Sequence, residues 1–330
     1  MISLFQRILT ATGRHPGILL VVGCLAGVCV ALLIPWYERT LRPSEMDFNF
    51  FLSICCVACL LLGMFACRAL EVATPRLWTG EDVLDATGSP LVDKLSISHS
   101  AKPLPLALKA ATSPTPLGRA AQQLKRESEN RHPPHDPSVA HGIIVVVAAV
   151  SSSASLAHTV GFLGRALAEL GLPTLIVDAD LSMRTLSHAM SAANQPGLAN
   201  VLASKNPTSL ASLKALILKQ DFHMDLLPAG SFEGDPTLNS EALIASEAFE
   251  HALEVLTSDY AFVILSAPDH AIAPSAIALA GACDALLLIG SHGKTRPKEA
   301  RAILQALDPY QRLWTRTILT HCPKRQMRID

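Results

Sequence analysis

The chain has 330 residues and a mass of 35.2 kDa, which allows one or two domains and a sizeable core. Half of its residues are hydrophobic, 17% are charged and its mean hydropathy is +0.33, values too apolar for a disordered or a purely soluble protein. With 27 Lys and Arg residues against 28 Asp and Glu residues, the charge balance gives no indication of a nucleic-acid partner.

Two uncharged apolar runs near the start of the chain predict a transmembrane hairpin over residues 1–70. The first run, 17–36, is long enough to cross the hydrocarbon core as a helix, and the second run is 50–67. Four arginines flank the pair against two in the short loop between the runs, which favours cytoplasmic positions for both termini. A cleaved signal peptide is the alternative for the first run, but the run is long for one and a second run follows it.

Residues 71–141 predict a flexible cytoplasmic tether. This stretch loses the apolar periodicity and gathers nine prolines together with Ser, Thr and His. Within it, residues 117–129 have the pattern of a short amphipathic helix that lies on a membrane or docks on a neighbour. A solvated helix or coil is the favoured interpretation of those residues.

From residue 142 onward, short apolar runs alternate with helical patterns. Strands are predicted at 143–150, 174–178, 224–227, 260–265, 285–289 and 315–319. Helices are predicted at 159–170, 198–203, 208–219, 240–257, 273–282 and 296–307. The order predicts an α/β domain over 142–330, with a mostly parallel, doubly wound sheet of the P-loop NTPase type.

The turn after the first predicted strand reads SSSASLAH, over residues 151–158, and is where such a sheet binds a phosphate. A phosphate-binding loop needs glycines, a lysine and a Ser or Thr hydroxyl for magnesium. No glycine lies between Gly142 and Gly161, and no lysine lies between Arg126 and Ser204. The serines and the helix N-terminus are able to hold a weak anion, but a serine-rich helix cap is the favoured interpretation.

Two carboxylates, Asp178 and Asp180, end the second predicted strand. Such a pair can hold magnesium and orient a hydroxyl nucleophile, or it can be solvated or cap a helix. The fourth predicted strand runs into Ser266, and the next carboxylate, Asp269, comes three residues later. A second metal contact is therefore missing at this strand end. The eight cysteines show no zinc-site spacing, and no metal centre is expected.

Five stretches together resemble the cytoplasmic domain of the bacterial tyrosine kinases (BY-kinases) and polysaccharide co-polymerases, a branch of the MinD/ParA-like P-loop proteins. They are LIVDADLSMR at 175–184, QPGLANVLA at 195–203, LLPAGSFEGDPTLNSEAL at 226–243, DYAFVILSAPD at 259–269 and CDALLLIGSHGKT at 283–295. Their order and spacing match along nearly all of residues 142–319. The resemblance implies the same fold and a nucleotide site built from Walker motifs.

The resemblance also assigns those motifs to positions in this chain. The catalytic lysine falls on Leu156 and the magnesium-binding hydroxyl on Ala157; the Walker A′ aspartates fall on Asp178 and Asp180, and the Walker B aspartate falls on Ser266. The degenerate phosphate loop comprises Ser151, Ser152, Ser153, Ser155, Leu156 and Ala157. Two of the three nucleotide-handling elements are thus lost, so neither ATP nor magnesium is expected as a cofactor.

Two further departures concern phosphate acceptors and the periplasmic side. The family uses a tyrosine-rich tail for autophosphorylation, whereas this chain has only Tyr37, Tyr260 and Tyr310 and ends in KRQMRID. The family usually places a large periplasmic domain between its spans, where this chain has about thirteen residues, 37–49. A role in chain-length control would therefore require a partner chain.

The leading hypothesis is a non-enzymatic, membrane-tethered scaffold or regulator in exopolysaccharide synthesis or export at the bacterial inner membrane. Its expected partners are polysaccharide synthesis or export proteins, an active co-polymerase or copies of itself. The second hypothesis is a weak ATPase or tyrosine kinase that uses ATP and magnesium through Asp178, Asp180 and a lysine from elsewhere, with Lys294 the nearest candidate. The third is a MinD/ParA-like positioning protein, for example in pilus assembly.

Overall fold

The computed structural model describes residues 75–77, 79–96, 104–110, 116–131, 142–150, 155–204, 212–220, 224–231, 239–268, 274–309 and 312–323, with isolated positions at 57, 63 and 69. The chain divides into two compact units, Met1–Pro75 and Arg76–Asp330, and the second contains the fold described below. Among the described residues no helix combines the length and apolarity needed to cross a membrane. The predicted spans at 17–36 and 50–67 fall outside those residues, apart from two isolated positions.

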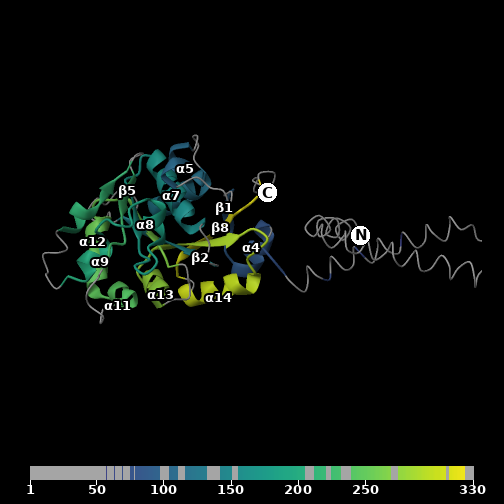
Figure 1. The fold of residues 1–330 in the computed structure, drawn as a ribbon. Coiled ribbons are helices and arrows are strands. Elements are labelled where there is room, and N and C mark those ends of the chain that lie inside the picture. Colours follow the sequence, from purple (N-terminus) through teal and green to yellow (C-terminus); the bar gives the residue numbers. More distant parts are fainter. Residues whose placement is uncertain are drawn as a thin grey trace, which may run out of the picture. The chain divides into compact units, whose positions relative to one another are not determined.

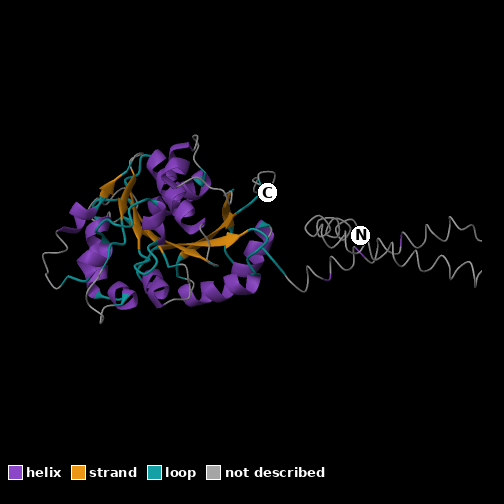
Figure 2. Ribbon diagram, in the orientation of Figure 1, coloured by secondary structure: helices purple, strands orange, loops and turns teal. Residues whose placement is uncertain are grey.

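An eight-stranded sheet forms the centre of the second unit, in the order β1-β8-β7-β2-β6-β3-β5-β4 (Figures 1 and 2). Its strands are β1 (Leu91–Leu95), β2 (Ile143–Ala149), β3 (Thr174–Asp178), β4 (Leu218–Lys219), β5 (Met224–Leu227), β6 (Phe262–Ser266), β7 (Ala285–Ser291) and β8 (Trp314–Thr320). Only the pairing of β4 with β5 is antiparallel. The predicted mostly parallel α/β fold is confirmed, and all six predicted strands are present.

Helices cover both faces of this sheet, as parallel strands with apolar side chains on both sides require (Figure 2). One face carries α5 (Leu104–Ala110), α6 (Gly118–Arg131), α7 (Ser155–Glu169) and α8 (Thr185–Ala189). The other face carries α4 (Gly80–Thr87), α9 (Leu198–Leu202), α11 (Ser240–Ile244), α12 (Glu247–Thr257), α13 (Pro274–Gly281) and α14 (Pro297–Leu307). Each face therefore encloses its own hydrophobic core.

The predicted tether is wrong over the residues that the structure describes within 71–141. Four elements, α4, β1, α5 and α6, lie there, and β1 pairs in parallel with β8 at one end of the sheet. Helix α6 is docked rather than solvated, since its Ala120, Ala121 and Leu124 are buried against the α7 side of the sheet. Three of these elements, α4, β1 and α5, have eight residues or fewer, and prolines separate them, so each buries too few residues to produce a sustained periodicity.

Two helix predictions also differ from the structure. Where a helix was expected at 208–219, the described residues are helical at 212–213 and then form a 3-10 turn (η1, Lys214–Leu216) and the short strand β4, so the helix ends earlier than predicted. The helix expected at 240–257 breaks into α11 and α12 because Ser246 caps the second helix, its hydroxyl accepting a hydrogen bond from the N–H of Phe249 (3.4 Å).

Candidate functional site

The first turn of α7 begins where the phosphate loop is expected, at the carboxyl end of β2. Ser151, Ser152 and Ser153 lie outside the described residues, whereas Ser155, Leu156 and Ala157 are described and buried. Leu156 and Ala157 thus fill the positions that the resemblance gives to the catalytic lysine and to the magnesium-binding hydroxyl. Both side chains are buried in the core on the α7 side of the sheet. The Ser155 hydroxyl accepts a hydrogen bond from that of Thr320 (3.4 Å), which ties α7 to the end of β8.

Asp178 ends β3 and is fully buried, yet both of its carboxylate oxygens have partners. Its Oδ2 accepts hydrogen bonds from the Ser187 backbone N–H (2.7 Å) and hydroxyl (2.6 Å), and its Oδ1 accepts one from the Asp180 N–H (3.3 Å). The Ser187 hydroxyl oxygen in turn accepts a hydrogen bond from the Ala229 N–H (2.9 Å). Asp178 therefore connects β3, α8 and the segment that follows β5.

Asp180 closes the turn that follows β3. Its Oδ1 accepts a hydrogen bond from the Met183 N–H (3.0 Å) and its Oδ2 accepts one from the Thr185 hydroxyl (2.9 Å), while only 1% of the residue is exposed. The turn ends in Arg184, whose φ of 53° lies in the left-handed region that side chains rarely adopt. Asp180 thus occupies the position of an internal turn cap, and the pair is not solvated.

The pKa of Asp178 is raised to about 7, chiefly by burial and also by the neighbouring Asp180 carboxylate, against the lowering effect of the hydrogen bonds from Ser187. A carboxyl with this pKa is partly protonated near neutral pH. It is a poorer ligand for a divalent cation than an ionised aspartate, because metal ligands must be deprotonated.

Ser266 ends β6 between two other strand ends. In the sheet register it is paired with Val147 of β2 and Asp178 of β3. The residue is fully buried, and among the described residues its hydroxyl has no hydrogen-bond partner. Its carbonyl oxygen accepts a hydrogen bond from the Ala179 N–H (3.2 Å). The residue in the Walker B position is therefore a neutral, unpaired hydroxyl beside a buried carboxyl, while Asp269 lies outside the described residues.

Lys294 lies in the turn between β7 and α14, on the same edge of the sheet. Its side chain is exposed, and its carbonyl oxygen accepts a hydrogen bond from the Arg76 guanidinium (2.5 Å). Both aspartates are buried and bonded internally, and among the described residues no ion pair joins this lysine to either of them. The described residues thus do not supply the cation that magnesium-dependent phosphoryl transfer uses beside the aspartates.

The PGLANVL and LLPAG motifs pair with each other. The N–H groups of Leu198 and Ala199 donate to the carbonyl oxygens of Pro228 (2.9 Å) and Ala229 (2.8 Å). This approach requires Gly197, because a Cβ there would lie 2.0 Å from the Pro228 oxygen. The Pro228–Ala229 segment also reaches Ser187 through the Ala229 N–H, so both motifs support the loop that Asp178 holds.

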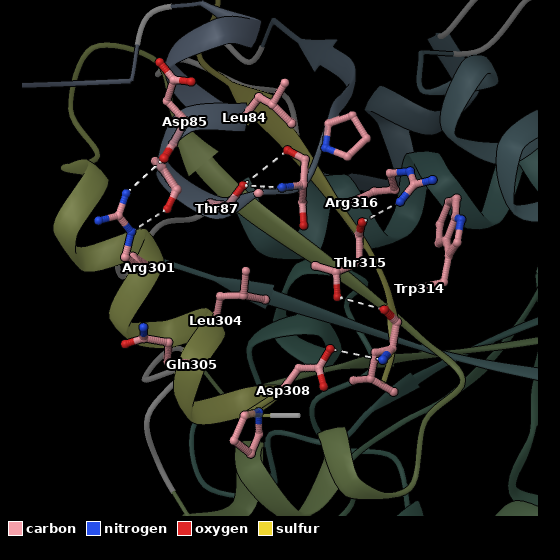
Figure 3. Close-up of a pocket in the computed structure, with 16 residues that line it drawn as sticks. Leu84, Asp85, Thr87, Arg301, Leu304, Gln305, Asp308, Trp314, Thr315 and Arg316 are labelled. Carbon is pink, nitrogen blue, oxygen red and sulfur yellow. Dashed lines mark hydrogen bonds between the residues drawn. The ribbon is translucent and has the colours of Figure 1, made fainter. Parts of the chain in front are cut away.

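A pocket of about 610 Å³ lies at the opposite edge of the sheet, between the C-terminal ends of α4 and α14 and the start of β8 (Figure 3). Two of its charged side chains are hydrogen-bonded within the fold. Arg301 donates to the carbonyl oxygens of Asp85 (2.9 Å) and Ala86 (3.0 Å) at the end of α4, and Asp308 accepts from the Arg312 N–H (2.8 Å). The pocket is separate from the edge that carries the aspartates.

The chain is similar in sequence to tyrosine-protein kinases of bacteria. No family model matches the chain. Over 155 residues it is 24% identical to tyrosine-protein kinase CpsD of Streptococcus agalactiae serotype III (strain NEM316), covering 46% of this chain and 63% of that protein. Over 140 residues it is 29% identical to tyrosine-protein kinase YwqD of Bacillus subtilis (strain 168), covering 42% and 56%. The chain thus spans less than two thirds of the length of these relatives.

Solved structures show the same fold. The kinase domain of Escherichia coli tyrosine kinase ETK matches with a TM-score of 0.60 and 18% identity, over 76% of this chain and 96% of that one. The chimerical protein CapA2B2 matches with a TM-score of 0.59 and 20% identity, over 74% and 100%. Residues 142–330 make up only about 57% of the chain, so these matches extend into residues before 142. The resemblance to the bacterial tyrosine kinases is confirmed.

Proposed function

We propose that this chain is a membrane-tethered, catalytically inactive relative of the bacterial tyrosine kinases, acting as a scaffold or regulator in exopolysaccharide synthesis or export. One observation supports this most strongly. The three positions that would carry the catalytic lysine, the magnesium-binding hydroxyl and the Walker B carboxylate hold Leu156, Ala157 and Ser266, all of them buried.

The chemistry of phosphoryl transfer explains why these replacements matter. That reaction is catalysed almost entirely by positioned charges and magnesium, and removing one such group typically costs about 3–4 kcal/mol of transition-state stabilisation. Leu156 and Ala157 carry no donor or charge. The two remaining aspartates have their oxygens engaged by Ser187, Thr185 and backbone N–H groups. The described residues therefore do not fit magnesium-bound ATP.

The fold does not depend on that chemistry. Asp178 and Asp180 hold the segments after β3 and β5 in place through neutral donors, so their retention is explained by structure alone. A domain that keeps its fold while losing nucleotide chemistry is suited to binding other proteins. Under this proposal the partners are polysaccharide synthesis or export proteins, an active co-polymerase or further copies of the chain, at the inner membrane with both termini cytoplasmic.

Calorimetry with magnesium and ATP on the purified full-length chain tests the proposal. We expect binding no tighter than millimolar, which corresponds to about 4 kcal/mol. The double variant Leu156→Lys/Ala157→Thr serves as the matched comparison, because it returns the two missing groups to the first turn of α7. Micromolar, magnesium-dependent binding by the unmodified chain would contradict the inactive reading and favour the weak ATPase or tyrosine kinase.

A further inference from the structure

The chain enters the second unit at the turn between β7 and α14. Leu77 is fully buried there; its N–H donates to the Thr295 carbonyl (3.0 Å), and its own carbonyl accepts from the Gly293 N–H (2.7 Å). The Arg76 guanidinium donates to the Lys294 carbonyl. These bonds fix the entry point at the carboxyl edge of the sheet.

The chain leaves the unit at the same edge. Strand β8 ends at Thr320, which is paired with Ser291 at the end of β7. The N–H of His292, in the entry turn, donates to the Thr320 carbonyl (2.9 Å). Leu77 and Thr320 are therefore both hydrogen-bonded to one turn, and the described chain ends soon afterwards at Pro323.

Cationic side chains gather around this entry turn, and we call them the basic corner: Arg76, Lys294, Arg296 and Lys298. The last three are exposed, and among the described residues neither Lys294 nor Lys298 has an acidic partner. Arg296 faces Glu299 at 3.8 Å, an exposed pair of the kind that contributes little.

Helix dipoles and acidic side chains also contribute to the charge at this corner. Helices α4 and α14 both begin here, so their positive dipole ends add to it, and Glu81 and Asp82 in the first turn of α4 partly offset it. In the sequence Arg68 precedes the entry point, and Lys324, Arg325 and Arg328 follow Pro323. Basic residues thus flank the domain in the sequence on both sides.

Chain length limits how far the corner can lie from a bilayer. If the second span ends at residue 67, as the proposed tether requires, the nine residues 68–76 reach at most about 30 Å when fully extended. Clusters of Lys and Arg close to a span are attracted to the negative surface of the cytoplasmic leaflet, an effect that fades within a Debye length of about 10 Å.

We infer that the basic corner docks on the anionic headgroups of the bilayer that holds the chain. The inference rests on the proposed membrane tether and adds an orientation to it. The carboxyl edge of the sheet, with the α7 N-terminus and Asp178, faces the membrane, while the pocket at the opposite edge faces away from it.

Lysine footprinting on the full-length chain in lipid nanodiscs tests this inference. Labelling by an amine-reactive acetylating reagent is compared between phosphatidylglycerol and phosphatidylcholine discs by mass spectrometry. We expect Lys294 and Lys298 to be labelled at least threefold more slowly in phosphatidylglycerol, with the difference removed by 0.5 M NaCl. Lys219, whose side chain is 78% exposed at the β4 end of the sheet, is the internal control and is expected to be labelled equally in both.

A charge-reversal pair separates docking from general lipid effects. In the variant Arg296→Glu/Lys298→Glu, labelling of Lys294 in phosphatidylglycerol is expected to rise to its phosphatidylcholine rate. The matched control Lys125→Glu, on α6, is expected to leave it unchanged. Equal labelling of Lys294 in both lipids by an inserted chain would overturn this inference alone, whereas extraction of the chain by alkaline carbonate would overturn the membrane tether and this inference with it.

Discussion

At the scale of single residues, two buried serines beside Asp178 have opposite energetic roles. The Ser187 hydroxyl donates to Asp178 and accepts from the Ala229 N–H, while among the described residues the Ser266 hydroxyl has no partner. Removing a bonded buried group leaves its partners unsatisfied, whereas removing an unsatisfied one relieves a desolvation cost.

We therefore predict that Ser187→Ala destabilises the protein by about 1–3 kcal/mol, while Ser266→Ala is neutral or stabilising by up to about 1 kcal/mol. Each substitution removes one hydroxyl group from a fully buried serine, so each is the control for the other. Urea unfolding of both variants measures the difference. Equal losses would show that Ser266 has a bonding role that the structure lacks.

Asp178 predicts a dependence of stability on pH. Its folded pKa of about 7 lies above the ordinary value of 3.8 for an aspartate. The folded state therefore binds the proton more tightly than the unfolded state, and the contribution of this group is most favourable below pH 4 and is lost as the pH rises through 7.

The variant Asp178→Asn cannot titrate at this position. We predict that its free energy of unfolding is lower than that of the unmodified chain at pH 5, and that this difference is smaller at pH 8 by more than about 1 kcal/mol. The reason is that only the unmodified chain loses the stabilisation from the Asp178 proton as the pH rises. Chemical denaturation at the two pH values measures the difference. A difference of equal size at the two pH values would mean that Asp178 is ionised in the folded protein throughout this range.

At the scale of secondary-structure elements, the segment before Gly142 completes the domain. Strand β1 covers the edge of β8, and α5 and α6 cover α7. Leu104 of α5 packs so closely on α7 that a Cβ at Gly161 would lie 3.2 Å from its side chain. Without these elements, an apolar helix face and a strand edge would be open to solvent, which favours aggregation.

We predict that a fragment of residues 76–330 is soluble and unfolds cooperatively, whereas one of residues 142–330 aggregates. In the longer fragment, Leu104→Asp is expected to cost more than about 3 kcal/mol, because it buries a charge in place of a packed side chain. Leu106→Asp, at a neighbouring position that is 55% exposed, is the matched control. Gel filtration and thermal melts report both results, and a monomeric fragment 142–330 of equal melting temperature would refute the expectation.

At the scale of the whole molecule, the parallel sheet was predictable because its central strands are buried on both faces and appear as continuous apolar runs. The positions of Asp178, Asp180 and Ser266 at strand ends followed from those runs. Their partners did not, since Thr185 and Ser187 lie in a short helix without a distinctive pattern. The domain boundary was also missed, because β1 contains Asp93 and Lys94, which are buried in the structure but read as polar in the sequence.

The pairing of β1 with β8 has a consequence during synthesis. About 220 residues separate Leu95 from Trp314, so the first strand of the sheet leaves the ribosome long before its only neighbour in the strand order. At bacterial elongation rates the delay is roughly 10–40 s. Through that interval β1 has no strand to pair with. The last strand of the sheet to be translated, β8, is the one that joins the two ends of the domain.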